Sequence, residues 1–231
     1  MRFDRPLVEA TFISRPNRFV VKALLGEAEV TAHVANSGRL EELLHADNTL
    51  LLARVPEGPA RRTGYDLVLV DVDGVLVSAD AQLPNTLFAE ALEARKVPEF
   101  SRHAGFRREV RLGESRIDFA LSRPDGDRYV EVKSVTLVVD GVGLFPDAPT
   151  ARGRRHVQSL VAVVEQGHGA AVVFVVQRPN VSSFSPNRSA DPQFCDALRD
   201  AAHRGIDVFA YRCDVRRDGV DLTDRVPIEL G

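Results

Sequence analysis

Two short segments, Arg116-Ile-Asp-Phe-Ala-Leu121 and Tyr129-Val-Glu-Val-Lys-Ser134, decide how the second half of this chain is interpreted. In the first segment apolar residues alternate with Asp118 and Ala120, which is the period of a β-strand. The second segment alternates in the same way, and the stretch between them contains Pro-Asp-Gly at 124–126, which is typical of a turn. The sequence therefore predicts a β-hairpin at this position.

Three ionisable side chains of this hairpin are predicted to converge. Side chains two residues apart on a strand point the same way, so Glu131 and Lys133 share a face, and Asp118 can join them from the neighbouring strand. Two carboxylates at close range cannot comfortably both stay ionised without a cation. The structural alternative is a solvated charge face, because such residues also occur on adjacent strands by chance.

A divalent metal site is the chemical interpretation of this trio. Mg²⁺ prefers oxygen ligands, accepts one or two carboxylates and keeps waters and phosphate oxygens as its other ligands. We therefore predict that Asp118 and Glu131 bind Mg²⁺ (or Mn²⁺) and that Lys133 positions or helps deprotonate an attacking water. The pattern of Asp, a spacer and Glu-x-Lys resembles the signature of the PD-(D/E)xK nuclease superfamily. That resemblance makes the three residues the catalytic candidates.

Glu109 is a candidate third carboxylate for the metal. It lies on the preceding predicted strand, 106–112, and would reach the other two carboxylates if the register of the strands matches. Arginines flank it on both sides, so a surface salt bridge is an equally good interpretation.

Several irregular motifs, in order along nearly the whole chain, resemble those of the sugar fermentation stimulation protein A family. They are Arg15-Pro-Asn-Arg-Phe19, His33-Val-Ala-Asn-Ser-Gly-Arg39, Pro84-Asn-Thr-Leu87, Ser115-Arg-Ile-Asp-Phe119, Tyr129-Val-Glu-Val-Lys-Ser-Val-Thr-Leu137 and Phe145-Pro-Asp-Ala-Pro-Thr-Ala-Arg-Gly-Arg-Arg-His156. The chain departs from the family in two places, with Ala35-Asn-Ser-Gly38 for the usual Pro-Asn-Thr-Gly and Ala89-Glu90 for Ala-Asn. The resemblance implies DNA binding more firmly than it implies cleavage.

Composition predicts an ordinary globular protein of the reducing cytosol. The 231 residues are 44% hydrophobic and 27% charged, and no apolar run approaches the roughly 18 residues that span a bilayer. The spacing of Cys195 and Cys213 matches no zinc site. The net charge of −3 argues against a surface coated by nucleic acid, although residues 101–160 carry more basic than acidic side chains. The oligomeric state is open, with a homodimer among the alternatives.

Two structural units are expected. Residues 1–80 contain six short strands and one small helix at 38–44, which suit an OB-like β-barrel. Residues 83–231 alternate strands with helices at 84–96, 150–166 and 190–204, and include a continuously apolar strand at 170–177. This order predicts a mixed α/β sheet flanked by helices, the architecture of restriction endonucleases that the nuclease resemblance implies.

Nucleic-acid contacts are predicted in both units. In the barrel the candidates are Arg15 and Arg18, and the family motif at 33–39 adds Asn36. In the second unit Arg152, Arg155 and His156 stand at the start of a helix, where free backbone amides and arginines favour a phosphate. A solvated basic first turn is the alternative for this cluster, and a purely structural role is the alternative for the barrel.

Two functions are consistent with the sequence. The first is a metal-dependent nuclease that hydrolyses phosphodiester bonds of DNA. The second is a non-catalytic, regulatory DNA-binding protein linked to sugar metabolism, in which the nuclease-like site is vestigial. The intact set of Asp118, Glu131 and Lys133 favours chemistry, because a pure binder has little reason to hold two carboxylates near a phosphate.

Overall fold

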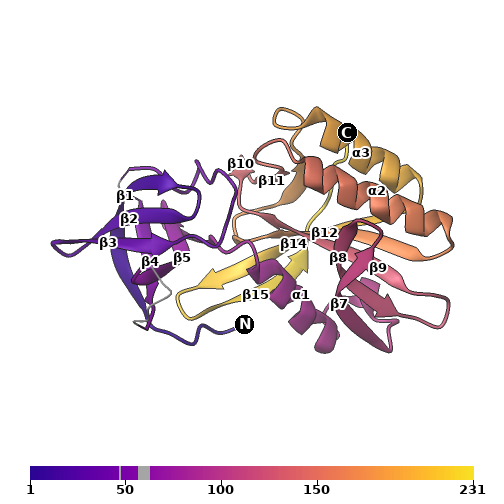
Figure 1. The fold of residues 1–231 in the computed structure, drawn as a ribbon, viewed down its shortest axis with the longest axis horizontal. Coiled ribbons are helices and arrows are strands. Elements are labelled where there is room, and N and C mark those ends of the chain that lie inside the picture. Colours follow the sequence, from indigo (N-terminus) through magenta and orange to yellow (C-terminus); the bar gives the residue numbers. More distant parts are fainter. Residues whose placement is uncertain (47, 57–62) are drawn as a thin grey trace.

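The computed structural model describes residues 1–46, 48–56 and 63–231, which form a β-barrel followed by an α/β unit (Figure 1). The barrel strands are β1 (Leu7–Asn17), β2 (Val20–Leu25), β3 (Ala28–His33), β4 (Thr49–Arg54), β5 (Tyr65–Val72) and β6 (Val75–Ser78). They follow the order β3-β2-β1-β4-β5-β6, and parallel pairing of β3 with β5 closes the sheet. Alternate side chains such as Val21, Ala23, Leu50 and Leu52 fill its core. The predicted OB-like barrel is confirmed.

The second unit is built on a mixed six-stranded sheet of order β15-β14-β12-β9-β8-β7. Its strands are β7 (Gly105–Leu112), β8 (Ser115–Ser122), β9 (Arg128–Val135), β12 (Gly169–Val176), β14 (Asp207–Arg216) and β15 (Gly219–Arg225). A small second sheet joins β10 (Val138–Val139), β11 (Val142–Phe145) and β13 (Ser183–Pro186). The central strand β12 is parallel to both β9 and β14, and its continuously apolar sequence is buried on both faces.

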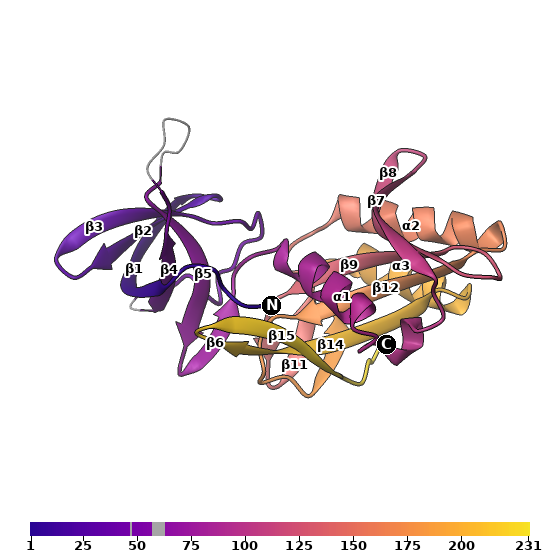
Figure 2. The same ribbon diagram turned by 90° about the horizontal axis from the view of Figure 1, so that it is seen from below.

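Helices cover both faces of the mixed sheet. Helix α1 (Leu83–Glu93) lies on one face, and α2 (Ala151–Glu165) and α3 (Pro192–His203) lie on the other (Figures 1 and 2). Val173 of β12 packs in the core on the α1 side, and its neighbour Phe174 packs in the core on the α2 side. The predicted mixed sheet with flanking helices is therefore confirmed. A short 3₁₀ turn, η1 (Pro98–Phe100), connects α1 to β7.

The first residues of the chain pack against the second unit rather than the barrel. The amino group of Met1 donates to the carbonyl of Val220 at 2.8 Å, and the amide of Phe3 donates to the backbone carbonyl of Asp218 at 2.9 Å. After the barrel, the amide of Ser78 donates to the carbonyl of Gln177 at 3.1 Å, and the Gln177 side chain donates to the carbonyl of Asp80 at 2.9 Å. The barrel is thus attached to the α/β unit on both sides of its sequence.

One predicted helix is wrong. Residues 38–44 form turns, in which the amides of Leu43 and Leu44 donate to the carbonyl of Leu40. Leu40 has a φ of 52°, in the left-handed region, so helical geometry cannot continue through it. The amide of Arg39 donates to the Asp147 carboxylate at 2.8 Å, which holds this segment against the second unit. Two fully buried leucines, Leu40 and Leu43, fix the segment on the barrel core.

The described helices are all short or polar. None of them combines the length and the apolar character needed to cross a membrane.

Candidate active site

Asp118 is positioned where the β8–β9 ladder opens. Backbone pairing between these strands runs from Leu121↔Arg128 to Phe119↔Val130. At the next step the carboxylate of Asp118 accepts the amide of Val132 at 2.8 Å, in place of a backbone carbonyl. Its other oxygen accepts a hydrogen bond from Asn85 Nδ2 at 2.9 Å, near the start of α1. Asp118 therefore lies half-buried between α1 and β9, beside Glu131.

Glu131 is 2% exposed, which is unusual for a carboxylate. Its Oε1 accepts hydrogen bonds from Lys133 Nζ and from Nδ1 of His156, on helix α2. Oε2 of Glu131 is buried and has no hydrogen-bond partner among the described residues. One oxygen of this carboxylate is thus held by two side chains, and the other is available to a ligand.

The pKa values of the two carboxylates are shifted in opposite directions. Burial and the negative charge of Glu131 raise the pKa of Asp118 to about 6, and the hydrogen bonds from Val132 and Asn85 offset only part of this rise. Burial also acts to raise the pKa of Glu131, but the charge of Lys133 and the hydrogen bond from His156 outweigh it, so this pKa is lowered. At neutral pH both groups are therefore largely ionised, which is the state that a cation stabilises.

The donor set fits one hard divalent ion. The unpartnered Oε2 of Glu131 and the carboxylate of Asp118 are oxygen ligands of the kind that Mg²⁺ and Mn²⁺ prefer. No group of three or more His, Cys, Asp or Glu side chains suited to a metal occurs in the described ranges. The remaining ligands would therefore be waters or substrate oxygens, which is the usual manner in which Mg²⁺ binds.

A cavity of about 390 Å³ lies next to these residues, between the barrel and the α/β unit. Lys133 lines it, together with Asn36 of the barrel and Thr150 at the start of α2. Thr150 caps α2, since its Oγ1 accepts the amide of Gly153 at 3.0 Å. The structure therefore brings the predicted Lys133 and Asn36 to one hollow, in front of the helix start that carries Arg152.

The basic cluster at the start of α2 has three different environments. Arg152 and Arg155 are exposed, whereas Arg154 forms an ion pair with the buried Asp191 at 2.8 Å. Nε of Arg152 donates to Nε2 of His156 at 3.4 Å, so the imidazole accepts at Nε2 and donates at Nδ1. The sequence predicts that His156 contacts nucleic acid. In the structure it is 6% exposed, and its Nδ1 donates a hydrogen bond to Glu131 instead.

The barrel arginines also differ. The guanidinium of Arg15 donates to the carbonyl oxygens of Arg39, Arg18 and Asn36, so it fastens the 36–39 segment. Arg18 is exposed, with its guanidinium 6.0 Å from the centre of the exposed Phe19 ring. Of the two, Arg18 is the one that faces solvent.

Glu109 does not join the other carboxylates. It lies at an irregular position of β7, with a φ of 54°, between the pairs Arg108↔Phe119 and Val110↔Ile117. Its Oε2 forms an exposed ion pair with Arg116 at 3.2 Å. The structure therefore supports the surface salt bridge. The register of β7 and β8 is the same on both sides of Glu109, and the local irregularity is its left-handed φ, at a residue whose carboxylate pairs with Arg116 at the surface.

Sequence reasoning missed the roles of Asn85 and His156 in this site. Asn85 lies in the Pro84-Asn-Thr-Leu87 motif, and nothing in that motif indicates that it donates to Asp118. His156 lies four residues after Arg152, on the same face of α2, and this spacing carries no signal for its contact with Glu131.

Comparison with known proteins identifies the family. The model for the sugar fermentation stimulation protein RE domain matches residues 82–219, and the model for the SfsA N-terminal OB domain matches residues 13–79. This chain belongs to the sugar fermentation stimulation protein family. A homologue from Chloroflexus aurantiacus is 48% identical over 96% of this chain and 86% of its own length. One from Moorella thermoacetica is 45% identical over 97% of both chains.

A solved structure shows the same architecture. Pyrococcus furiosus SfsA, described in complex with Ca²⁺, has 29% sequence identity to this family member and a TM-score of 0.89. The alignment covers 99% of this chain and 98% of that one, so barrel and α/β unit are shared together.

Proposed function

We propose that this SfsA-family protein is a metal-dependent nuclease that hydrolyses phosphodiester bonds of DNA. Asp118 and Glu131 are the ligands of Mg²⁺ or Mn²⁺, and Lys133 acts on the attacking water and the phosphate. The observation that carries the proposal is Glu131, a buried carboxylate with one oxygen fixed by Lys133 and His156 and the other without a partner. The Ca²⁺ complex of the Pyrococcus furiosus relative supports it, because Ca²⁺ and Mg²⁺ prefer the same oxygen ligands.

Each side chain of the site has a separate role in the proposed reaction. A bound metal supplies Lewis-acid polarisation of the phosphate and a lower pKa for a coordinated water. Lys133, at the edge of the cavity, holds its ammonium where it stabilises negative charge developing on the phosphate oxygens. His156 and Lys133 orient Glu131, and Asn85 with the amide of Val132 orients Asp118.

The proposed substrate is supported by the surroundings of Lys133. The cavity opens between an OB-like barrel and the start of α2, and OB barrels commonly bind nucleic-acid strands. Arg152 and Arg155 add exposed positive charge at a helix N-terminus, where phosphates are favoured. The direct test is incubation of the purified protein with single- and double-stranded DNA and 5 to 10 mM Mg²⁺ or Mn²⁺, roughly the usual conditions for such enzymes, with separation of the products by size.

A non-catalytic DNA-binding protein is the second candidate. One observation favours it: each oxygen of Asp118 already accepts a hydrogen bond, from Asn85 and from Val132. A site kept only by inheritance could be satisfied internally in this way. Binding of DNA without cleavage of any substrate form, with either metal, would establish this second function.

Metal binding is expected to stabilise the protein more at pH 7 than at pH 5. Because the pKa of Asp118 is raised to about 6, a proton occupies this carboxylate at pH 5 and competes with the metal. At pH 7 the carboxylate is ionised, and metal at ten times its Kd should add about 1.4 kcal/mol, or roughly 3–6 °C in Tm. Thermal unfolding with and without 10 mM MgCl₂, roughly the concentration of standard assays, measures the difference.

The control for this measurement is Glu109→Gln, which removes a carboxylate from the neighbouring strand outside the site. It should keep the full stabilisation at pH 7, whereas Asp118→Asn should lose it. Equal stabilisation at both pH values would contradict the assignment of Asp118 as a metal ligand.

DNA affinity is expected to depend steeply on salt through the start of α2. If Arg152 and Arg155 each contact one phosphate, the double replacement by alanine should flatten the plot of log K against log[salt] by about 2 units of slope. Fluorescence anisotropy in metal-free buffer, over a range of NaCl concentrations, gives this slope. Arg199→Ala on α3 and Arg204→Ala at its C-cap are the matched control, since both side chains are partly exposed on another helix. A slope that stays the same in the Arg152/Arg155 variant would leave the cluster as a solvated helix start.

A further inference from the structure

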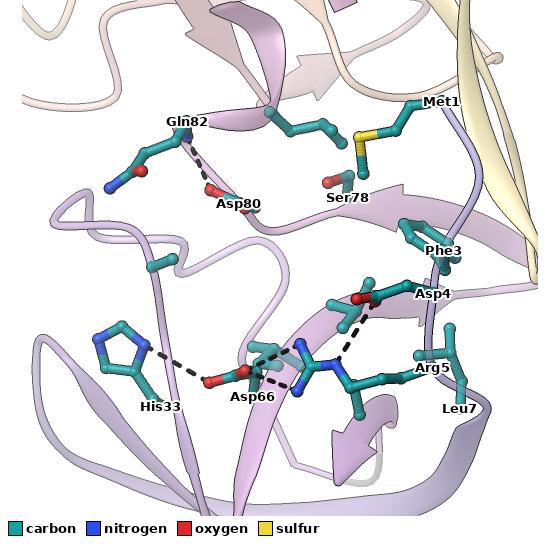
Figure 3. Close-up of a pocket in the computed structure, with 15 residues that line it drawn as sticks. Met1, Phe3, Asp4, Arg5, Leu7, His33, Asp66, Ser78, Asp80 and Gln82 are labelled. Carbon is teal, nitrogen blue, oxygen red and sulfur yellow. Dashed lines mark hydrogen bonds and ion pairs between the residues drawn. The ribbon is translucent and has the colours of Figure 1, made fainter. Parts of the chain in front are cut away.

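A second cavity, of about 340 Å³, lies on the other side of the barrel–α/β junction, beneath the first residues of the chain (Figure 3). In the view of Figure 3 Ser78, Asp80 and Met1 lie on one side of the cavity, and His33, Asp66 and Arg5 lie across from them. The proposed nuclease does not use any of these side chains. The cavity has a charged part and an apolar part, and each constrains what it can bind.

The charged part is negative. Asp4, Asp66 and Asp80 line the cavity, and Arg5 is the one arginine among its lining residues. Both terminal nitrogens of Arg5 donate to the same oxygen of Asp66 at 3.1 Å, so this cation is already paired. Asp80 accepts the amide of Gln82 at 2.7 Å, and no Lys or Arg lies within 4.0 Å of its carboxylate in the described part of the chain. Burial and, to a smaller extent, the charge of Asp66 raise the pKa of Asp80, and the amides of Gln82 and Leu83 and the nearby His33 offset only part of this rise.

A buried hydroxyl points into the same space. Ser78 is fully buried, and its Oγ has no hydrogen-bond partner among the described residues. Figure 3 shows this hydroxyl directed into the cavity, between the side chains of Asp80 and Phe3. A buried hydroxyl without a partner is costly, and native structures usually provide one, so the position calls for a ligand or a water. Ser78 and Asp80, two residues apart, would reach the same bound group.

The apolar part excludes a bare metal ion. Met1, Phe3 and Leu83 form a wall next to Ser78 and Asp80, and an inorganic cation would gain nothing from such contacts. The described residues also contain no group of three His, Cys, Asp or Glu side chains that could hold a metal. A carboxylate beside apolar side chains instead matches a molecule that has a cationic end and an apolar body.

We propose that this cavity is a binding site for a small organic ammonium compound. Its ammonium group forms an ion pair with Asp80 and donates a hydrogen bond to Ser78 Oγ. Its apolar body lies against Met1, Phe3 and Leu83. The assignment does not depend on the nuclease activity, because it rests on a separate cavity.

Three probes of equal size test the charge requirement. Benzylammonium, benzyl alcohol and benzoate share the same ring and differ in charge. Ligand-observed NMR and calorimetric titration of the full chain at pH 7 should show benzylammonium bound at least tenfold more tightly than the other two. Equal affinity for all three would mean unspecific adsorption to an apolar wall and would overturn the proposal. Absence of binding by benzylammonium, or its displacement by Mg²⁺ at the same concentration, would overturn it as well.

Two variants test the residues. Asp80→Asn should weaken benzylammonium binding at least tenfold, while its amide oxygen still accepts the Gln82 amide and preserves the start of α1. Ser78→Ala should weaken it about threefold without loss of stability, because the hydroxyl has no partner to lose. The matched control is Asp73→Asn in the exposed β5–β6 turn, whose φ of 52° suits Asn equally well. Unchanged affinity in folded Asp80→Asn, or a tenfold loss in the Asp73 control, would refute the assignment.

Discussion

Glu131→Gln and Asp118→Asn are each expected to abolish metal-dependent cleavage of DNA. Each change removes one negative charge from the pair that would hold the metal. The loss of several kcal/mol of charge stabilisation corresponds to a decrease in turnover on the order of 10³-fold. The measurement is the rate of product formation at saturating DNA and Mg²⁺, compared with the wild-type protein.

The matched control is Glu109→Gln, a carboxylate on the neighbouring strand that pairs with Arg116 at the surface. Its cleavage rate should stay within about twofold, since exposed ion pairs contribute little. DNA binding without metal should survive in the two site variants, and even tighten, because negative charge facing the phosphates has been removed. Full cleavage by either site variant would exclude the proposed metal ligands.

Asp191→Ala is expected to cost a large amount of stability for a single change outside the hydrophobic cores. Asp191 is 3% exposed and joins two helix starts. Its carboxylate accepts the amide of Phe194 at 3.0 Å, the amide of Thr150 at 2.8 Å and the guanidinium of Arg154 at 2.8 Å. Removal leaves buried donors without an acceptor, so the free energy of unfolding should fall by about 3 kcal/mol. Urea denaturation followed by circular dichroism measures this loss.

The pH dependence of this contribution has a defined sign. Burial acts to raise the pKa of Asp191, but the amides of Thr150 and Phe194 and the charge of Arg154 outweigh it, so the pKa is lowered in the folded state. A lowered folded pKa stabilises the protein above the unfolded value, about 3.9, and this stabilisation disappears as the pH falls below it. The difference between wild type and Asp191→Ala should therefore shrink under acidic conditions. Asp196→Ala on the same helix is the control, because Asp196 is exposed and should cost less than about 0.5 kcal/mol. A similar loss in both variants would contradict the special role of Asp191.

The sequence predicts the features that depend on residues close together in the chain. Alternation over two residues placed Glu131 and Lys133 on one face, and their direct contact follows from that spacing. The continuous apolar run of β12 and the helix stretch after Thr150 are also local signals. The two-residue turn Arg217-Asp218 between β14 and β15, followed by Gly219, is another local signal.

The features that could not be predicted depend on packing between distant segments. His156 and Glu131 are 25 residues apart, and only the position of α2 on the sheet brings the imidazole to the carboxylate. Asn85 reaches Asp118 across 33 residues for the same reason. The turn at 38–44 is held by the burial of Leu40 and Leu43 in the barrel core and by the hydrogen bond to Asp147, more than 100 residues away, rather than by its own helix propensity. In each case tertiary contacts override what the local sequence favours.

The attachment of Met1 and Phe3 to β15 has a mechanical consequence. A barrel joined to the neighbouring unit by a single linker is free to rotate about that linker. Here residues 1–3, which precede the barrel, form hydrogen bonds at β15, the edge strand of the mixed sheet. Residues 78–80, which follow the barrel, form hydrogen bonds with Gln177 of the same α/β unit. Rotation about either attachment would break hydrogen bonds at the other, so the two attachments together oppose reorientation of the barrel relative to the mixed sheet. The same hydrogen bonds oppose movement of the barrel surface relative to Lys133. For the proposed function, the spacing between these two contact points would therefore be set before a nucleic-acid strand binds.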